Sequence, residues 1–485
     1  MGLGFVHVVH PRLGHACTMA KSVDEAKTTM RPRCVMTLRR AIERYHELLT
    51  PEVAAESQAL LDEQLLSRGL FFGDRALCTV LRPRLLLGEQ YGYVQQQCAL
   101  LLAAFARALR AALGDRAVLD QFGLEDWERT LVEFDAGFRE ASPTSRLDAF
   151  YDADAGPLYF TEFNAETPAG LAYGDALSDA FLALPVAGDF LREYELRPLP
   201  ARHGVLFPLL DSFRSWRGAR EQPRIAILDW REVPTYNEFV LFERYFHALG
   251  IPCVIADPRE VAYDNGRLVC GDFHITLIYK RVLLSELVAR GGIDHPVIRA
   301  VRDRAACMVN PFRCKILHKK ASLAVLSDER NAHLFTAEQR DAIDAHIPWT
   351  RVVAERTTVY QGDRIDLVPW IAANRDALVL KPNDEYGGKG IVLGWEVDDD
   401  TWSDALASAL EAPSIVQRRI RLPTESYPSF VNGSVQFADR MVDLAPFVSH
   451  GRYVEGCLTR LGTTPLLNVT AGGGSTVPTF VVARR

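Results

Sequence analysis

The first part of the chain has hydrophobic and polar residues at helical spacing. This pattern extends from about Arg31 to Phe138, and its stretch Leu85–Leu113 is rich in Leu, Ala, Gln and Arg. Thr50–Pro51 marks a helix start, because a proline fits the first turn, where its missing N–H is not needed. We predict a mainly helical region over residues 1–138, to which the sequence assigns no chemistry.

Strand patterns begin at Arg146. Arg146–Phe150 and Leu158–Phe163 are short runs with aromatic and branched residues, and the turn sequence Asp-Ala-Asp-Ala-Gly-Pro separates them. The pattern predicts a β-hairpin within residues 139–200. A linker rich in Pro and Arg is expected from Arg197 to about Pro223.

A strand–helix–strand pattern follows the expected linker. Arg224–Asp229 is an apolar strand, Glu238–Leu249 is a helix, and Pro252–Ala256 and Leu277–Tyr279 are further strands. Short links between such elements are typical of a βαβ unit with a parallel sheet. We therefore predict a small α/β domain over residues 220–309.

Helices and strands alternate again from Asn310 onward, and residues 310–485 are treated as the last unit. The predicted fold class is α/β with α+β character, and no fixed-period repeat is visible. The strands expected in this unit are Ala377–Lys381, Ile391–Trp395, Ile415–Arg419, Ser434–Phe437 and Thr464–Val469.

Composition and charge narrow the function classes. A chain of 485 residues exceeds one ordinary core and suggests several packed units. The formal net charge of −7 argues against a nucleic-acid partner, because binding phosphates requires a basic surface. No stretch approaches the ~20 uninterrupted apolar residues of a membrane helix, so we expect no membrane partner.

The nine cysteines show no C-x-x-C pair and no zinc-ligand spacing. Their odd number, together with the absence of a signal-peptide pattern, predicts a cytoplasmic protein. Cys17 is interpreted as an unpaired thiol rather than a nucleophile, because no activating partners can be identified.

Polar residues at alternate positions of the expected hairpin are the most informative feature. Arg146 and Asp148 share one face of the first strand, and Glu162 and Asn164 share one face of the second. Neighbouring strands lie roughly 5 Å apart, so one Arg and three oxygen donors converge. Such donors suit Mg²⁺ with phosphate oxygens, and Arg146 is expected to contact a phosphate. The alternative is an ordinary solvated hairpin face.

A lysine and a glycine-rich loop form the second candidate site. An apolar strand delivers Lys381, and Gly387, Gly388, Lys389 and Gly390 follow in a loop. Glycines let backbone N–H groups approach phosphate oxygens, and the lysines add positive charge. The sequence lacks the G-x-x-x-x-G-K-[ST] pattern of a Walker A loop. A simple tight turn is the alternative.

Three further segments support a phosphate-binding interpretation. Lys319 or Lys320, at a helix start, could reach a phosphate, although a solvated basic face explains them equally. Gln417, in an expected strand, and the backbone around it are suited to an adenine edge. The loop from Asn468 to Ser475 is rich in glycine and is weak evidence alone.

These motifs together resemble the ATP-grasp enzymes. Lys381 and its glycine loop are similar to the family's lysine and mobile flap, and Gln417–Ile420 is similar to the strand that holds adenine. Arg146-x-Asp148 and Glu162-x-Asn164 resemble the magnesium-binding strands. Those strands follow the lysine loop in ordinary members but precede it here. This order matches the circularly permuted families, which include glutathionylspermidine synthetase-like proteins.

The resemblance extends from about Arg146 to the C-terminus, and residues 224–281 resemble the small domain that precedes ATP-grasp lobes. The N-terminal helical region rests on weaker similarity, and no amidase domain is found. The resemblance implies phosphorylation of a carboxylate by ATP and attack of an amine on the acyl phosphate. An ATP-dependent kinase and a non-catalytic nucleotide-binding scaffold are the alternatives.

The resemblance also implies ATP and Mg²⁺ as cofactors and assigns roles to single residues. The expected partners are a small-molecule carboxylate and an amine (an amino acid, peptide or polyamine); the sequence leaves the oligomeric state open, and a homodimer is one alternative. Implied catalytic residues are Arg146, Lys381 and Arg460. Implied metal ligands are Asp148, Glu162 and Asn164. Implied nucleotide-binding residues are Lys320, Lys381, Gly387, Gly388, Lys389, Gly390, Gln417, Arg418 and Ile420.

Overall fold

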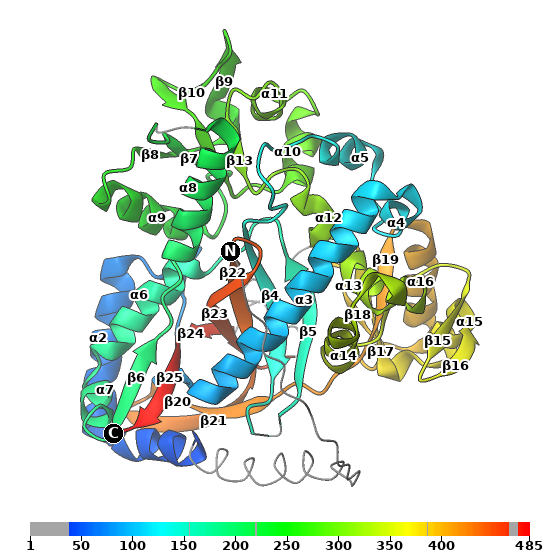
Figure 1. Cartoon of the computed structure of the whole chain (residues 1–485). Coiled ribbons are helices and arrows are strands. Elements are labelled where there is room, and N and C mark those ends of the chain that lie inside the picture. The colour runs from blue at the N-terminus through cyan, green and yellow to red at the C-terminus, as the bar shows by residue number, and fades with distance from the viewer. Residues whose placement is uncertain (1–37, 155, 219–220, 386, 465–473) are drawn as a thin grey trace, which may run out of the picture.

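The computed structural model describes residues 38–154, 156–218, 221–385, 387–464 and 474–485 (Figure 1). Cys17, most of the strand expected at Thr464–Val469 and most of the loop expected from Asn468 lie outside these residues. The domain limits predicted from the sequence stay predictions, because the elements described below pack across them.

A seven-stranded sheet forms the centre of the molecule. The predicted hairpin is confirmed, with Asp148 opposite Glu162 and Arg146 opposite Asn164. The second strand of the hairpin is an edge of the sheet, and the first pairs with a strand some 300 residues later, in which Phe447 faces Arg146. The strands are β4 (Thr144–Tyr151), β5 (Leu158–Asn164), β20 (Thr424–Val431), β21 (Ser434–Val442), β22 (Ala445–Ser449), β23 (Tyr453–Gly462) and β24 (Ser475–Val477), in the order β20-β21-β23-β22-β4-β5, with β24 beside β23.

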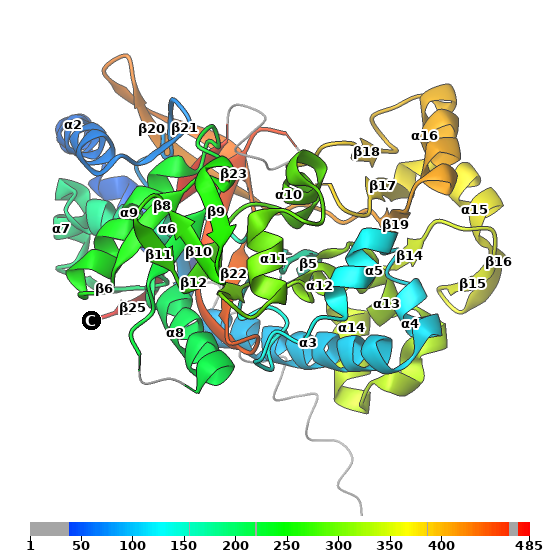
Figure 2. The same cartoon turned by 90° about the horizontal axis from the view of Figure 1, so that it is seen from above.

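One long helix, α3 (Gly88–Gly114), covers a face of this sheet (Figure 2). Among the described residues, it is long and apolar enough by composition to cross a membrane, although Arg107 and Arg110 interrupt it. Its buried side chains join the main core, in which the Phe105 and Phe163 rings lie 4.6 Å apart. The helix therefore packs against the hairpin and helps to fix its position.

The N-terminal region contains strands as well as the predicted helices. Residues 38–48 are helical, and β3 (Arg84–Leu87) pairs in parallel with β25 (Thr479–Arg484), which also pairs with β6 (Tyr194–Pro198). This sheet joins the N-terminal region to the C-terminal strand of the chain. The remaining elements here are α2 (Pro51–Arg68), β1 (Phe71–Phe72), β2 (Arg75–Ala76), α4 (Arg116–Asp120), α5 (Asp126–Val132), α6 (Leu171–Leu182) and α7 (Pro185–Phe190).

The predicted small α/β unit contains a four-stranded parallel sheet in the order β13-β12-β7-β8. Its first strand, β7, lies between β8 and β12, so the chain leaves β7 to one side and later returns to the other. The elements are β7 (Ile225–Leu228), α9 (Tyr236–Ala248), β8 (Cys253–Ala256), β9 (Val261–Asp264), β10 (Arg267–Cys270), β11 (Phe273–Ile275), β12 (Leu277–Lys280), α10 (Leu284–Gly291), α11 (Pro296–Arg302) and β13 (Cys307–Val309).

The linker expected from Arg197 to Pro223 is wrong over most of its length. Residues His203–Arg217 form the helix α8, which contains Pro208. Its apolar side chains, among them Leu209 and Phe213, pack into the core beneath the parallel sheet. Burial of this face outweighs the backbone hydrogen bond that the proline removes.

The last unit carries a four-stranded antiparallel sheet in the order β14-β19-β17-β18. The expected strands that lie within the described residues are confirmed with shifted ends, and the one expected at Ile391–Trp395 shortens to two residues. The elements are α12 (Cys314–His318), α13 (Ala321–Ser327), α14 (Ala337–His346), β14 (Thr350–Val352), β15 (Thr357–Tyr360), β16 (Asp363–Asp366), α15 (Leu367–Ala373), β17 (Leu378–Pro382), β18 (Val392–Leu393), α16 (Asp399–Glu411) and β19 (Ser414–Arg418).

Candidate active site

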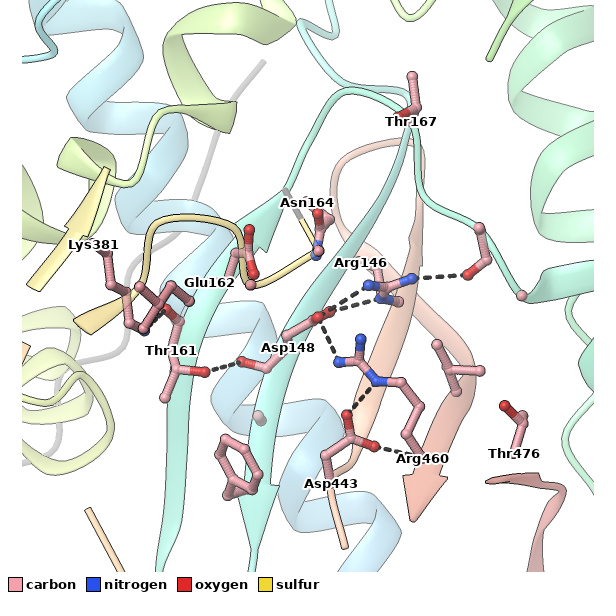
Figure 3. A pocket seen from close by; sticks show the side chains of 18 of the residues that line it. Arg146, Asp148, Thr161, Glu162, Asn164, Thr167, Lys381, Asp443, Arg460 and Thr476 are labelled. Atoms are coloured by element: carbon pink, nitrogen blue, oxygen red, sulfur yellow. Dashed lines mark hydrogen bonds and ion pairs between the residues drawn. The ribbon is translucent and has the colours of Figure 1, made fainter. Parts of the chain in front are cut away.

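One cavity of about 520 Å³ collects most of the predicted site residues. Its walls come from the β4–β5 hairpin, the sheet of the last unit, β23, and the loops that follow β7 and β12. Figure 3 shows the part of the cavity around the hairpin, Lys381 and Arg460. Lys320, Lys389 and Gly390 do not line it. The predicted residues that do are Arg146, Asp148, Glu162, Asn164, Lys381, Gly387, Gly388, Gln417, Arg418, Ile420 and Arg460.

Asp148 lies between two guanidinium groups (Figure 3). Arg146 Nε and Nη2 donate to its two oxygens at 2.6 and 2.9 Å, and Arg460 Nη2 donates to Oδ2 at 2.7 Å. Burial opposes ionisation of Asp148, but the two arginines outweigh it and hold the pKa well below its usual value. Arg146 pairs with Asp148 because residues two apart on a strand share a face, and its expected contact with a phosphate stays a prediction.

Arg460 reaches Asp148 because a second carboxylate fixes it. Its Nε donates to Asp443 Oδ2 at 2.6 Å, and Asp443 is almost fully buried. Burial raises the pKa of the Asp443 carboxyl, partly offset by Arg460. Sequence reasoning assigned Arg460 to the site but missed Asp443, whose position just before β22 gives no recognisable signal.

Glu162 faces Lys320, with 3.2 Å between Oε1 and Nζ. Burial opposes its ionisation, but the charges of Lys320 and Lys381 keep its pKa below the usual value. Of the two lysines, Lys320 is therefore the one beside Glu162, and its contact with a phosphate stays a prediction. Lys319 points elsewhere, with its Nζ 2.7 Å from Glu128 Oε1.

Lys381 is held at the junction of the hairpin and the last unit. Its Nζ donates to Gln417 Oε1 at 2.7 Å and to the Thr161 carbonyl at 3.4 Å. Burial lowers the pKa of Lys381 to about 8, and the nearby charge of Lys320 contributes to the decrease. An anion such as a phosphate placed in the cavity would favour the charged ammonium.

The Gln417 side chain is buried and positions Lys381. Its Oε1 accepts from Lys381, and its Nε2 donates to Thr350 Oγ1 at 3.0 Å. Gln417 also lines the cavity, and its contact with an adenine edge stays a prediction. The cavity beside it has apolar walls suited to a flat ring, formed by Val379, Ile391, Leu393, Trp395, Ile420 and Leu422.

The glycine loop has the backbone that its sequence predicts. Gly387, Gly388 and Gly390 have φ of 64°, 78° and 70°, which side-chain-bearing residues rarely adopt. A Cβ at Gly390 would lie 2.8 Å from Pro382 Cγ. Lys389 was predicted to bind nucleotide, but its Nζ lies on the exposed side, 3.2 Å from Glu385 Oε1.

A buried cluster of charged residues lies next to the site, and the sequence analysis did not predict it. Glu166 is inaccessible, and Lys280 Nζ and Lys315 Nζ lie 3.0 and 3.2 Å from its oxygens. These partners hold the pKa of Glu166 well below its usual value despite burial. Lys315 also donates to Asp384 at 2.8 Å, so the cluster ties the root of the glycine loop to the hairpin.

The donor set fits Mg²⁺. Asp148 and Glu162 face each other across the β4–β5 ladder, and both are kept ionised. With the Asn164 amide they supply only hard oxygen ligands, which Mg²⁺ prefers. The described residues contain no group of three His, Cys, Asp or Glu that forms a metal cage. A magnesium ion here would therefore complete its shell with water and phosphate oxygens.

Two curated proteins resemble the chain along most of its length. "Putative glutamate–cysteine ligase 2-2" of Frankia casuarinae is 25% identical over 490 residues, covering 93% of this chain and 52% of that protein. "Putative glutamate–cysteine ligase 2-3" of Frankia alni is 24% identical over 474 residues, with coverages of 90% and 51%. The chain thus spans about half the length of these relatives. No protein-family profile matches it.

A solved structure shares the fold. The glutathione synthetase-like effector GSS30 of Globodera pallida, in its apo form, superposes with a TM-score of 0.56 at 14% identity, covering 89% of this chain and 98% of that one. The chain therefore has a mixed α/β fold that it shares with a glutathione synthetase-like protein. The names of the sequence relatives and of this structure agree with the ATP-grasp-like ligase resemblance that the motifs indicated.

Proposed function

We propose that the chain is an ATP- and Mg²⁺-dependent ligase that activates a carboxylate as an acyl phosphate and joins it to an amine. One observation carries the proposal. The cavity brings Asp148 and Glu162 of the hairpin together with Lys381 and Arg460 from distant parts of the chain. Phosphoryl transfer needs both sets, because carboxylates hold the metal and cations hold the phosphates.

Each group of cavity-lining side chains has a proposed role that follows from its position. The apolar slot from Val379 to Leu422 takes the adenine ring, and Lys381 binds a phosphate at its open end. Bound magnesium would be held by Asp148, Glu162 and Asn164 and would neutralise charge on the phosphates. Arg146 and Arg460 present fixed positive charge beside Asp148, where the transferred phosphoryl group and the substrate carboxylate meet. Such preorganised charge lowers a barrier without reorganisation during the reaction.

The glycine loop Gly387–Gly390 covers the cavity in which the reaction takes place. Gly387 and Gly388 already line the cavity, and the loop root is fastened to the charge cluster through Asp384. Excluding water protects an acyl phosphate from hydrolysis until the amine attacks. In this proposal the magnesium strands precede the lysine strand, so the ATP-grasp site is circularly permuted.

An ADP-release assay tests the proposal. Purified protein with MgATP is supplied with amino acids, short peptides and polyamines, singly and in pairs, and products are identified by mass spectrometry. The proposal expects ADP and an amide product only when acid and amine are both present. ADP with a phosphorylated product and no amide would favour a kinase. Absence of MgATP binding by calorimetry would refute the nucleotide site itself.

A further inference from the structure

The parallel sheet of the small unit has a topological switch point that the proposed chemistry does not use. The chain runs from β7 to β8 on one side and returns to β12 on the other. In open α/β sheets, ligands bind outside the carboxyl ends of the two strands at such a point. Asp229 directly follows β7, and Arg281 directly follows β12.

The cavity extends to this switch point. Asp229, Arg281, Val233, Leu283 and Glu286 line it together with the residues of the proposed nucleotide site. One ligand, or two ligands in contact, can therefore reach from Asp148 to the carboxyl ends of β7 and β12. We call this end of the cavity, defined by those five residues, the switch-point subsite.

Asp229 has a carboxylate oxygen with no partner. Only 7% of the residue is exposed, and its Oδ1 accepts from the Trp230 N–H at 2.8 Å. No described residue donates a hydrogen bond to Oδ2. A buried carboxylate oxygen facing a cavity costs free energy unless a ligand or water completes it. Burial raises the pKa of Asp229 to about 7; Glu286 adds to the increase, and the charges of Arg281 and Lys280 oppose it.

The cation at this end of the cavity, Arg281, has partners other than Asp229, although its charge also acts on Asp229. Arg281 donates to the Pro168 carbonyl, and its Nη2 lies 3.7 Å from Glu238 Oε2. Its side chain is almost completely buried. Glu286 accepts from Trp230 Nε1 at 3.0 Å and adds a second carboxylate. The subsite therefore places the carboxylates of Asp229 and Glu286 beside the apolar side chains of Val233 and Leu283, with the Arg281 guanidinium paired to Glu238 nearby.

We propose that the switch-point subsite binds a primary ammonium group of a substrate through Asp229 and Glu286, with an attached aliphatic chain along Val233 and Leu283. This inference rests on the proposed function and specifies one of its substrates. The bound ammonium is not the reacting nitrogen, because a protonated amine has no lone pair for attack. The substrate thus carries an ammonium at one end and its reacting carboxylate or amine at the other.

Ligand-observed NMR on the full chain tests the subsite with n-butylamine as the probe. At pH 8 the probe is a cation, and n-butanol and n-butyrate are its neutral and anionic counterparts. We expect binding of the cation alone. Asp229→Asn keeps the acceptor for Trp230 and should weaken binding at least about tenfold, the size of a charge-assisted hydrogen bond. Asp264→Asn, at an exposed position of the same unit, is the matched control.

The outcomes separate the subsite from the ligase proposal. Equal binding of butanol or butyrate, or unchanged binding in Asp229→Asn, overturns the subsite. Glu286→Gln gives a second test if Asp229→Asn fails to fold. Calorimetry with MgATP on the same samples reports the nucleotide site independently. Butylamine binding without MgATP binding would uphold the subsite and refute the ligase, and the reverse result would refute the subsite alone.

Competition by two bifunctional probes identifies the substrate that carries the ammonium. If it belongs to the acid substrate, 4-aminobutyrate displaces butylamine more strongly in the presence of MgATP than 1,4-diaminobutane does. If it belongs to the amine substrate, the order is reversed. Failure of both probes to displace butylamine overturns the assignment of the subsite to a substrate.

Discussion

Lys381 Nζ donates a hydrogen bond to the carbonyl oxygen of Thr161, 220 residues earlier in the chain, across 3.4 Å. This contact joins the strand of the lysine loop to the strand that carries Glu162. Asp148 and Lys381, which belong to two separate motifs of the sequence, both line the same cavity.

Replacing Lys381 by Met should weaken MgATP binding with little change in fold. Loss of a partly buried, phosphate-paired ammonium typically costs about 2–5 kcal/mol of binding free energy. Isothermal titration calorimetry measures it, and circular dichroism checks the fold. Arg364→Met, at an exposed position of β16, is the control and should bind normally. Equal ATP affinity in the two variants would remove Lys381 from the site.

Replacing Arg460 by Met should destabilise the protein through Asp443. The variant leaves a buried carboxylate without its charged partner, which typically costs about 3–5 kcal/mol. Urea unfolding of the single variants and of Arg460→Met with Asp443→Asn gives the coupling free energy. We expect the double variant to recover much of the loss. Strict additivity would show that the 2.6 Å pair does not govern stability.

The stability of the protein should depend on pH through Asp229. Its folded pKa of about 7 lies above the usual 3.8, mainly because of burial, with Arg281 and Lys280 opposing and Glu286 reinforcing the increase. The folded state therefore holds a proton that the unfolded chain loses. This contribution to the free energy of unfolding is largest below pH ~4. It decreases by about 1.4 kcal/mol per pH unit between the two pKa values and is lost once the pH has risen through 7.

Asp229→Asn cannot titrate and should lack this decline. Denaturant unfolding between pH 4 and 8 compares the variant with the unchanged protein, and Asp264→Asn should behave like the latter. A constant difference in free energy between Asp229→Asn and the unchanged protein at every pH would contradict the raised pKa.

Replacing Lys320 by Met should loosen the glycine loop. Lys320 donates to the Glu385 carbonyl and pairs with Glu162 at 3.2 Å, so it connects the loop to a proposed metal ligand. Hydrogen exchange over residues 384–390 should accelerate about tenfold, the equivalent of one lost hydrogen bond. Arg340→Met, on α14, should leave it unchanged. Unaltered exchange in Lys320→Met would show that the loop is held otherwise.

Local patterns sufficed for much of the fold. The β4–β5 hairpin follows from its turn sequence, and the parallel strands follow from apolar runs with short links. The linker prediction failed at α8 because its Pro and Arg residues conceal an apolar face visible only in packing. The pairing of β3 with β25 was not predictable, since nearly 400 residues separate them.

The candidate site was predictable where residue type and spacing decide the chemistry. Asp148, Glu162 and Lys381 lie as predicted because strand periodicity fixes their faces. The partners of these residues were not predictable. Whether Gln417 faces a ligand or Lys381 depends on the register between β17 and β19. Asp229 was missed because its burial, not its sequence context, makes it unusual.

The sheet order has a consequence for biosynthesis. Asp148 leaves the ribosome 312 residues before Arg460. At usual elongation rates, the ribosome needs roughly 15–60 s to add these residues. During that interval β4 has an unpaired edge where β22 will bind, and such an edge can pair with other chains. Co-translational folding can therefore complete the small parallel sheet early, whereas the surroundings of Asp148 form only after β23 has emerged.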